Sequence, residues 1–380
     1  MKYVDDFRRG DVAWALAQSI HAEIQPGRRY RLMEFCGGHT HAIARYGLTS
    51  LLPDSIELIH GPGCPVCVLP IGRIDSAIAL VKEHAVTLCT YGDVLRVPAS
   101  GGVSLFHARA EGADVRMVYS VTDALELARR EPEREVAFFG LGFETTTPPT
   151  AVALLAARDE GLRNFSVYCN HVLTPPAMNH LLQDGVDLLD GFIGPSHVST
   201  VIGAAPYRAV AARYRKPIVI AGFEPIDVLQ AVYMLVRQIN EGRAEVQNQF
   251  TRAVTEQGNL RAQDYMAQTL QRRDSFEWRG LGSVPSSALA IRPEFADWDA
   301  ERRYDMHTSA VADSAACACG DILRGLKKPS DCKVFGTACT PTTPIGACMV
   351  SSEGACAAYH QYGRFLRKMP SKPVTAMETA

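Results

Sequence analysis

The sequence predicts an α/β fold with two similar lobes, each a parallel sheet with flanking helices, and a small C-terminal domain of helices and loops. Short apolar strand patterns alternate with helical segments as far as about residue 225. Such alternation is typical of parallel sheets with helices on both faces. Cysteines then gather in a Gly- and Pro-rich stretch near the end, which indicates a separate domain built around thiols.

Bulk properties restrict the class of protein. A chain of 380 residues with 47% hydrophobic content is expected to form two or three domains. The net charge of -2 and the absence of a basic run argue against a nucleic-acid partner. No apolar signal region opens the chain, and no stretch approaches the ~18–20 apolar residues that cross a bilayer. We therefore expect a cytoplasmic protein with no membrane contact, in which the clustered members of its eleven cysteines serve as metal ligands or redox thiols.

The first element is a helix over residues 11–24, because Val12, Leu16, Ile20 and Ile24 share one helical face. Eight strands are expected at residues 31–35, 56–60, 86–90, 115–120, 135–140, 165–170, 191–194 and 217–221. Helical segments separate most of them, for example residues 72–83, 123–130 and 150–160.

Four strands followed by four more suggest a first lobe over residues 1–122 and a second over residues 123–225. Residues 226–272 have the apolar spacing of long helices, and a Gly/Pro-rich segment over residues 278–301 leads into the cysteines. We place the third domain at residues 226–365. The polar residues 366–380 are expected to form a flexible tail.

Four cysteines in the last domain have the spacing C-x14-C-x6-C-x16-C, and they are Cys317, Cys332, Cys339 and Cys356. This spacing fits neither a zinc ribbon or finger nor the tight cysteine run of ferredoxins. It favours a dedicated [4Fe–4S] site, with zinc or unliganded thiols as the alternatives. Cys319 and Cys348 lie in the same stretch and could replace one of the four ligands.

Unusual residues fall where the strands end. The loops have the sequences FCGGHTH, GPGCPVC, TYGDVLRVP, GLGFETTTPP, CNHVLTPP, GPSHVST and AGFEP. The carboxyl ends of parallel strands line the ligand crevice of α/β sheets, so two lobes with such loops are expected to face each other across a cleft.

Cys36 follows a strand and precedes two glycines at an expected helix N-terminus, which would lower the pKa of its thiol. With His39 and His41 it forms a ligand set suited to iron or zinc. The alternative is a buried cysteine with two capping histidines.

Cys64 and Cys67 form a C-P-V-C pair, which can close a disulfide or hold one edge of a metal site. The alternative is a turn that happens to contain two cysteines. Glu353 precedes Cys356 by three residues and could move protons or tune a cluster, or else be an exposed carboxylate. Cys89 and Cys169 lie within apolar strand patterns and are expected in the core.

Four polar residues on loops of the second lobe are more often caps or turn partners when taken singly. Together they form a candidate lining of the cleft: Glu144, His171, His197 and Glu224.

Several strings of the chain closely resemble the HypD family of [NiFe]-hydrogenase maturation factors. They are CGGHTH, GPGCPVC, GFETT, GPSHVS and CTPTTPIGACMVSSEGAC, together with the spacing of the four late cysteines. The resemblance covers roughly residues 1–365, almost the whole chain.

The resemblance implies a scaffold on which the Fe(CN)2CO group of the hydrogenase active site is assembled. A small HypC-type chaperone would share the iron, and a HypE-type protein would supply cyanide. By motif, Cys36 would bind the iron with support from His39, while Cys64 and Cys67 would be redox-active or close to the iron. The four late cysteines would hold a [4Fe–4S] cluster. Cyanide and carbon monoxide favour low-spin Fe(II), and the cluster and the dithiol would supply the electrons that keep the iron reduced.

Two other classes of function remain open at this point. One is a stand-alone [4Fe–4S] enzyme, a lyase or reductase acting on a small substrate. The other is a thiol–disulfide oxidoreductase with a metal-stabilised tail. The scaffold interpretation predicts redox activity without the turnover of a conventional enzyme.

Overall fold

The computed structural model describes residues 4–183 and 188–366. The tail expected over residues 366–380 lies outside this part of the chain, apart from Leu366 at the end of the last helix. Within the described ranges, none of the helices combines the length and the apolar content needed to span a bilayer.

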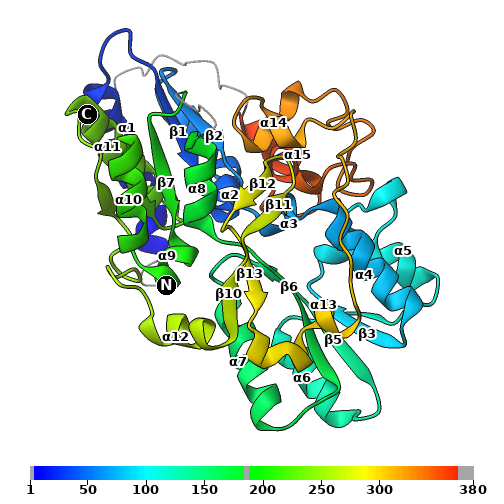
Figure 1. Cartoon of the computed structure of the whole chain (residues 1–380). Helices are drawn as coiled ribbons and strands as arrows, with labels where there is room; N and C mark the ends of the chain where they lie inside the picture. Colours follow the sequence, from blue (N-terminus) through cyan, green and yellow to red (C-terminus); the bar gives the residue numbers. More distant parts are fainter. Residues whose placement is uncertain (1–3, 184–187, 367–380) are drawn as a thin grey trace.

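The fold class is confirmed: two parallel sheets are flanked by helices (Figure 1). The first sheet has five strands in the order β2-β1-β7-β8-β9. Their bounds are β1 Tyr30–Glu34, β2 Ile56–His60, β7 Gly191–Pro195, β8 Ile218–Ala221 and β9 Val246–Asn248. All four pairings are parallel. Both faces are covered, as parallel sheets require.

Helices α1 (Gly10–Glu23) and α11 (Pro225–Asn240) pack on one face of this sheet. The helix expected over residues 11–24 is thus α1. The other face is covered by three further helices: α8 Thr174–Gln183, α9 Ser196–Ile202 and α10 Ala205–Tyr214.

The second sheet has four parallel strands in the order β4-β3-β5-β6. Their bounds are β3 Val86–Thr90, β4 Val115–Met117, β5 Glu135–Gly142 and β6 Phe165–His171. Two helices cover each face, namely α4 Ile71–Glu83 and α5 Leu105–Ala110 on one, and α6 Val121–Arg130 and α7 Thr147–Asp159 on the other. Cys89 and Cys169 are buried in this sheet, so their predicted core positions are confirmed.

The predicted grouping of the strands is wrong. Strands β1 and β2 share a sheet with β7, β8 and β9. All four strands of the second sheet lie between β2 and β7 in the sequence. The border expected between residues 122 and 123 therefore falls inside the second sheet. Consecutive strands are neighbours in most folds but not in all. Apolar runs of similar length do not show which strands pair with each other.

The interpretation of residues 226–272 as long helices is correct only for α11. After this helix the chain adds β9 to the first sheet and forms the shorter α12 (Leu260–Thr269). Because α11 packs on β7 and β8, it belongs to the first sheet and not to a third domain.

Two small antiparallel pairs follow in the Gly/Pro-rich region. Strand β10 (Leu270–Arg272) pairs with β13 (Leu289–Ile291), and β11 (Ser275–Trp278) pairs with β12 (Gly282–Pro285). Helix α13 (Ala300–Arg303) ends this connection.

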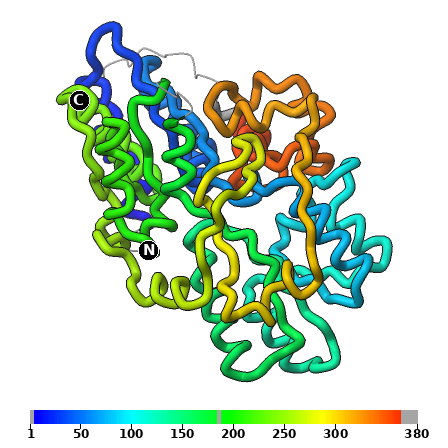
Figure 2. The backbone as a smooth tube through the Cα atoms, in the orientation of Figure 1, coloured from blue at the N-terminus to red at the C-terminus, as the bar shows by residue number. Residues whose placement is uncertain are grey.

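The cysteine-rich end is a region of loops with two helices, α14 (Cys319–Leu323) and α15 (Ala355–Leu366). Helix α15 packs along α2 (Gly37–Arg45), which directly follows β1. The orange and red end of the chain thus lies beside the blue N-terminal segment (Figure 2). This arrangement brings the last cysteines to the loops that carry the first ones.

Candidate functional site

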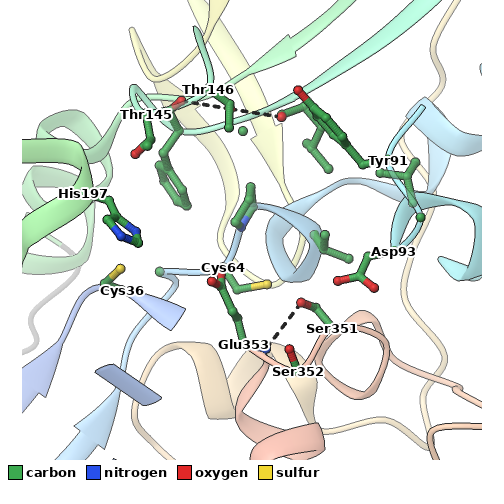
Figure 3. A pocket seen from close by; sticks show the side chains of 18 of the residues that line it. Cys36, Cys64, Tyr91, Asp93, Thr145, Thr146, His197, Ser351, Ser352 and Glu353 are labelled. Carbon is green, nitrogen blue, oxygen red and sulfur yellow. Dashed lines mark hydrogen bonds between the residues drawn. The ribbon is translucent and has the colours of Figure 1, made fainter. Parts of the chain in front are cut away.

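A cavity of about 510 Å³ opens where the strand ends of both sheets meet the cysteine-rich region. Its cysteine and polar lining residues are Cys36, Cys64, Tyr91, Asp93, Thr145, Thr146, His197, Ser351, Ser352 and Glu353. Cys36 and His197 lie on one side of the cavity and Asp93 on the other, with Cys64 and Glu353 between them (Figure 3). The predicted cleft lined by strand-end loops is therefore present.

The lining contains no Lys or Arg within the described part of the chain. Asp93 and Glu353 supply carboxylates, Cys36 and Cys64 supply thiols, and His197 supplies an imidazole. These groups attract and can coordinate a metal cation, and nothing among them neutralises a phosphate. The cavity is thus suited to a cation and poorly suited to a nucleotide.

Cys36 is the N-cap residue of α2, with extended backbone angles of φ -156° and ψ 128°. The loop around it is tightly packed, because a Cβ atom on Gly63 would lie 2.3 Å from the Cys36 amide nitrogen. Only glycine allows the GPGCPVC loop to approach the CGGHTH loop so closely.

The expected lowering of the Cys36 pKa is wrong. Burial raises the pKa of this thiol, and the negative charges of Glu353 and Glu34 raise it further. The amides of Gly38 and His39 act in the predicted direction, but their effect is smaller than that of burial.

Cys64 and Cys67 lie at the ends of one helical turn, α3 (Pro65–Val68), with Cys64 as its N-cap residue. The Cys67 amide donates to the Cys64 carbonyl oxygen at 3.1 Å, which closes this turn. Both thiols are free, and both side chains are buried. Burial and the neighbouring Cys64 raise the pKa of Cys67, with smaller effects from Cys356 and Glu353.

Glu353 connects the cavity with the cysteine-rich region. Its side chain lies against the first turn of α2, since a Cβ on Gly37 would be 2.9 Å from Glu353 Oε2. Burial raises the pKa of this carboxyl, and Asp93 and Glu34 raise it further. The alternative of an exposed carboxylate is therefore wrong.

The histidine that lines the cavity is His197, whereas His39 lies behind it. His39 is fully buried, and its Nε2 contacts the carbonyl oxygens of Ala221 at 3.0 Å and Gly222 at 3.1 Å. Its Nδ1 has no hydrogen-bond partner within the described residues. The Phe223 ring packs between the two histidines, at 4.9 Å from His39 and 4.2 Å from His197.

The other members of the candidate lining do not reach this cavity. The Glu144 carboxylate accepts hydrogen bonds from Thr174, and His171 Nε2 contacts the Thr150 hydroxyl at 2.9 Å. Glu224 pairs with Arg8. Asp93 was not predicted as a site residue, although its loop, TYGDVLRVP, is one of the strand-end loops.

The four late cysteines surround a small enclosed cavity of their own. Its sulfur lining consists of Cys317, Cys319, Cys332, Cys339, Cys348 and Cys356. Burial raises the pKa of Cys356, and the nearby thiols of Cys317, Cys339 and Cys332 raise it further. Neighbouring thiolates repel one another, so each thiol disfavours ionisation of the others. A shared cationic centre stabilises all four thiolates.

Two contacts of this cavity fit an iron–sulfur cluster. The Ile345 amide donates to Cys339 Sγ at 3.3 Å, which is a common feature of cluster ligands. A Cβ on Gly346 would lie 2.4 Å from Cys317 Sγ, so only glycine leaves this sulfur room. As the structure stands, no three His, Cys, Asp or Glu side chains in residues 4–183 and 188–366 are arranged to hold one metal ion.

The two sulfur-rich sites lie close together. One buried core contains cysteines of both sites: Cys64, Cys67, Cys319, Cys332, Cys339, Cys348 and Cys356. Cys317 is partly buried and packs against this core. Helix α3 also contacts the turn Ala347–Met349, which carries Cys348.

Comparisons with known proteins agree with this arrangement. The family model described as "HypD: Hydrogenase formation hypA family" matches residues 11–363. The chain is 60% identical over 375 residues to the hydrogenase maturation factor HypD of Rhizobium leguminosarum bv. viciae, covering 97% of both chains. It is 62% identical over 369 residues to the hydrogenase expression/formation protein HupD of Azotobacter chroococcum mcd 1, covering 96% of this chain and 97% of that one. With the hydrogenase maturation factor HypD of Escherichia coli (strain K12), the identity is 46% over 367 residues, covering 95% of this chain and 98% of that one.

Proposed function

The chain belongs to the HypD family of hydrogenase maturation factors, and on this premise we propose that it holds iron through Cys36 while the Fe(CN)2CO group is assembled. The observation that carries this proposal is the composition of the cavity wall. It offers two thiols, two carboxylates and an imidazole, and no Lys or Arg in the described residues. Such a wall favours Fe(II) over any anionic substrate.

Cyanide and carbon monoxide are strong-field ligands, so the iron has to be kept as low-spin Fe(II). Oxidation of the Cys64 and Cys67 thiols to a disulfide releases two electrons and two protons. One electron would reduce Fe(III) to Fe(II), and the other would reduce the oxidised cluster by one electron. The two cysteines lie in the same helical turn, α3, and a C-x-x-C pair at this spacing can close a disulfide. Glu353 lines the cavity beside Cys64, and its carboxylate could accept one of these protons while the other passes to solvent.

A [4Fe–4S] cluster held by Cys317, Cys332, Cys339 and Cys356 would supply single electrons. The four thiols around one cavity and the amide donor to Cys339 support this assignment. We propose that electrons pass between the two sites, and the contact of α3 with the turn Ala347–Met349 supports this proposal.

We propose a small HypC-type chaperone and a HypE-type cyanide donor as partners. The chaperone would complete the iron site with a cysteine of its own, and the donor would add the cyanide groups. Thiols that serve as metal ligands or redox groups persist in a reducing compartment, so we propose the cytoplasm as the place of assembly.

One experiment tests the iron site directly. The chain is purified anaerobically together with its small chaperone, and infrared bands of iron-bound cyanide and carbonyl are recorded. Cys36→Ala is expected to abolish these bands and the associated iron, while the visible absorption of the cluster persists. Cys89→Ala is the matched control, since Cys89 is a core thiol of the second sheet.

Two results would contradict the proposal. If Cys36→Ala removed the iron and the cluster together, the two sites would not be separate. If the isolated chain turned over a small substrate without partners, a lyase or reductase would describe it better.

A further inference from the structure

A buried carboxylate lies directly behind Cys36. Glu34 is the last residue of β1, and its side chain is shielded from solvent. Its Oε2 accepts a hydrogen bond from the Cys36 amide at 3.0 Å. Its Oε1 accepts one from the Thr40 hydroxyl and contacts His60 Nδ1 at 2.8 Å. Among the described residues, no Lys or Arg pairs with this carboxylate, so His60 is its ionisable partner.

Glu34 and His60 form the last rung of the pairing between β1 and β2. Beyond this rung, one strand leads to Cys36 and the other leads to Cys64. Backbone hydrogen bonds continue the link, from the Gly61 amide to the Glu34 carbonyl oxygen at 2.9 Å and from the Gly37 amide to the Gly63 carbonyl oxygen at 3.1 Å. The side-chain pair therefore fixes the point at which the two cysteine loops diverge.

The same pair also contacts the cysteine-rich region. The His60 ring packs edge-on against the Tyr359 ring, with 5.2 Å between centroids and 88° between the planes. Tyr359 lies on α15, three residues after Cys356. Three segments that carry Cys36, Cys64 and Cys356 thus meet at one buried polar group.

A buried carboxylate without a permanent cation is costly, and it is tolerated when all its hydrogen bonds are made. Here the bonds go to the backbone of the proposed iron ligand and to the neighbouring strand. Groups behind a metal ligand fix its orientation and typically account for about 10–100-fold in metal affinity.

Resting on the proposed function, we infer that Glu34 and His60 are positioning residues of the iron site. They set Cys36 relative to Cys64 and do not themselves contact the iron. Gln at position 34 can still accept from the Cys36 amide and preserves the geometry, whereas Ala cannot.

The test uses the full chain, purified anaerobically with its cluster. Fe(II) bound beyond the cluster iron is measured by equilibrium dialysis, and cluster content by visible absorption. Glu34→Ala is expected to weaken Fe(II) binding by about tenfold or more, and Glu34→Gln by no more than about threefold, with unchanged cluster absorption. The rate of Cys36 alkylation without iron gives an independent readout and is expected to rise in the Ala variant only.

A second pair of variants keeps the test valid if Glu34→Ala does not fold. His60→Ala leaves the hydrogen bond between Glu34 and the Cys36 amide intact, but it removes the side-chain contact between Glu34 and the strand that leads to Cys64. It is expected to weaken Fe(II) binding, and His60→Gln, which can donate to Glu34, is expected to restore it. Glu301→Gln is the matched control, because Glu301 is a largely buried carboxylate that pairs with Arg73 and Arg273 away from the cavity.

The outcomes separate the two proposals. Equal Fe(II) binding by the unmodified chain and Cys36→Ala would contradict the iron site itself. A Cys36-dependent site that Glu34→Ala leaves unchanged would overturn only the inference about Glu34. A Gln variant as weak as the Ala variant would also overturn it, because charge and not position would then be the decisive property.

Discussion

Glu144 is a buried carboxyl group that couples stability to pH. It lies in the loop after β5, where its two oxygens accept from the Thr174 amide and hydroxyl, both at 2.9 Å. Burial raises its pKa from the ordinary 4.5 to about 7. The protonated form is therefore favoured in the folded protein.

The sign of the resulting pH dependence follows from this raised pKa. The stabilising contribution is complete below pH 4.5 and is lost as the pH rises through about 7. At about 1.4 kcal/mol for each pH unit between these values, the loss amounts to at most roughly 3.5 kcal/mol. We expect the thermal midpoint of the unmodified chain to fall between pH 5.5 and 8.5, and that of Glu144→Gln to fall less. Parallel curves for the two proteins would contradict this.

The identity of the site residues was easier to predict than their environment. Cys36, Cys64 and Cys67 stand out because thiols beside glycines and prolines at strand ends are rare in purely structural loops. The pKa of Cys36 was predicted with the wrong sign, because burial and the charge of Glu353 dominate it. Neither effect is visible in the residues next to it.

At the scale of elements, one arginine joins the second sheet to the cysteine-rich region. Arg96, in the turn after β3, donates to the Val350 carbonyl oxygen at 2.8 Å and reaches the Pro341 carbonyl oxygen at 3.5 Å. These two carbonyls lie within the loop between Cys339 and Cys356. The guanidinium therefore contacts that loop at two points nine residues apart.

We expect Arg96→Ala to fold but to release the cluster faster. A hydrogen bond from a half-exposed charged group contributes about 1 kcal/mol, which corresponds to roughly a fivefold rate increase. The measurement is the anaerobic loss of visible absorption in the presence of a chelator. Arg129→Ala is the control, because Arg129 pairs with Glu160 on the outer helices of the second sheet. Equal rates for the two variants would show that the loop is held by other contacts.

The positions of the strands were predictable because their patterns are local. The strands expected at 56–60 and 86–90 have these bounds in the structure. Strand β9 was missed because Val246–Asn248 is short and largely polar. Strand β9 forms because it pairs with the edge of β8, and this pairing depends on residues distant in the sequence.

At the scale of the whole molecule, the two sheets and the cysteine-rich region share one core. Apolar residues of both sheets and the late cysteines other than Cys317 belong to the same buried set, for example Met33, Leu88, Phe192 and Cys348. We therefore expect one cooperative unfolding transition. Melting curves from far-ultraviolet circular dichroism and from cluster absorption should coincide within about 2 °C. Two separate transitions would mean that the sheets unfold as independent units.

The strand order explains why the division into lobes could not be predicted. Each strand pattern is apolar and similar in length, so a split into four and four was as consistent with the sequence as the observed order. The strand-end rule nevertheless held, because it depends on the parallel direction of the strands and not on which strands are neighbours.

The interleaved order of the strands has a consequence for biosynthesis. The segments that carry Cys36 and Cys64 are synthesised first. Their sheet is complete only after β7, β8 and β9 have been made, and the second sheet is translated between β2 and β7. The cavity wall is finished only when Glu353 has left the ribosome, and the last thiol of the quartet follows it. Nascent chains fold from the N-terminus as they emerge, so a partly translated chain presents scattered thiols and no finished metal pocket. The proposed iron loading would therefore follow synthesis of the segment that carries Glu353 and Cys356.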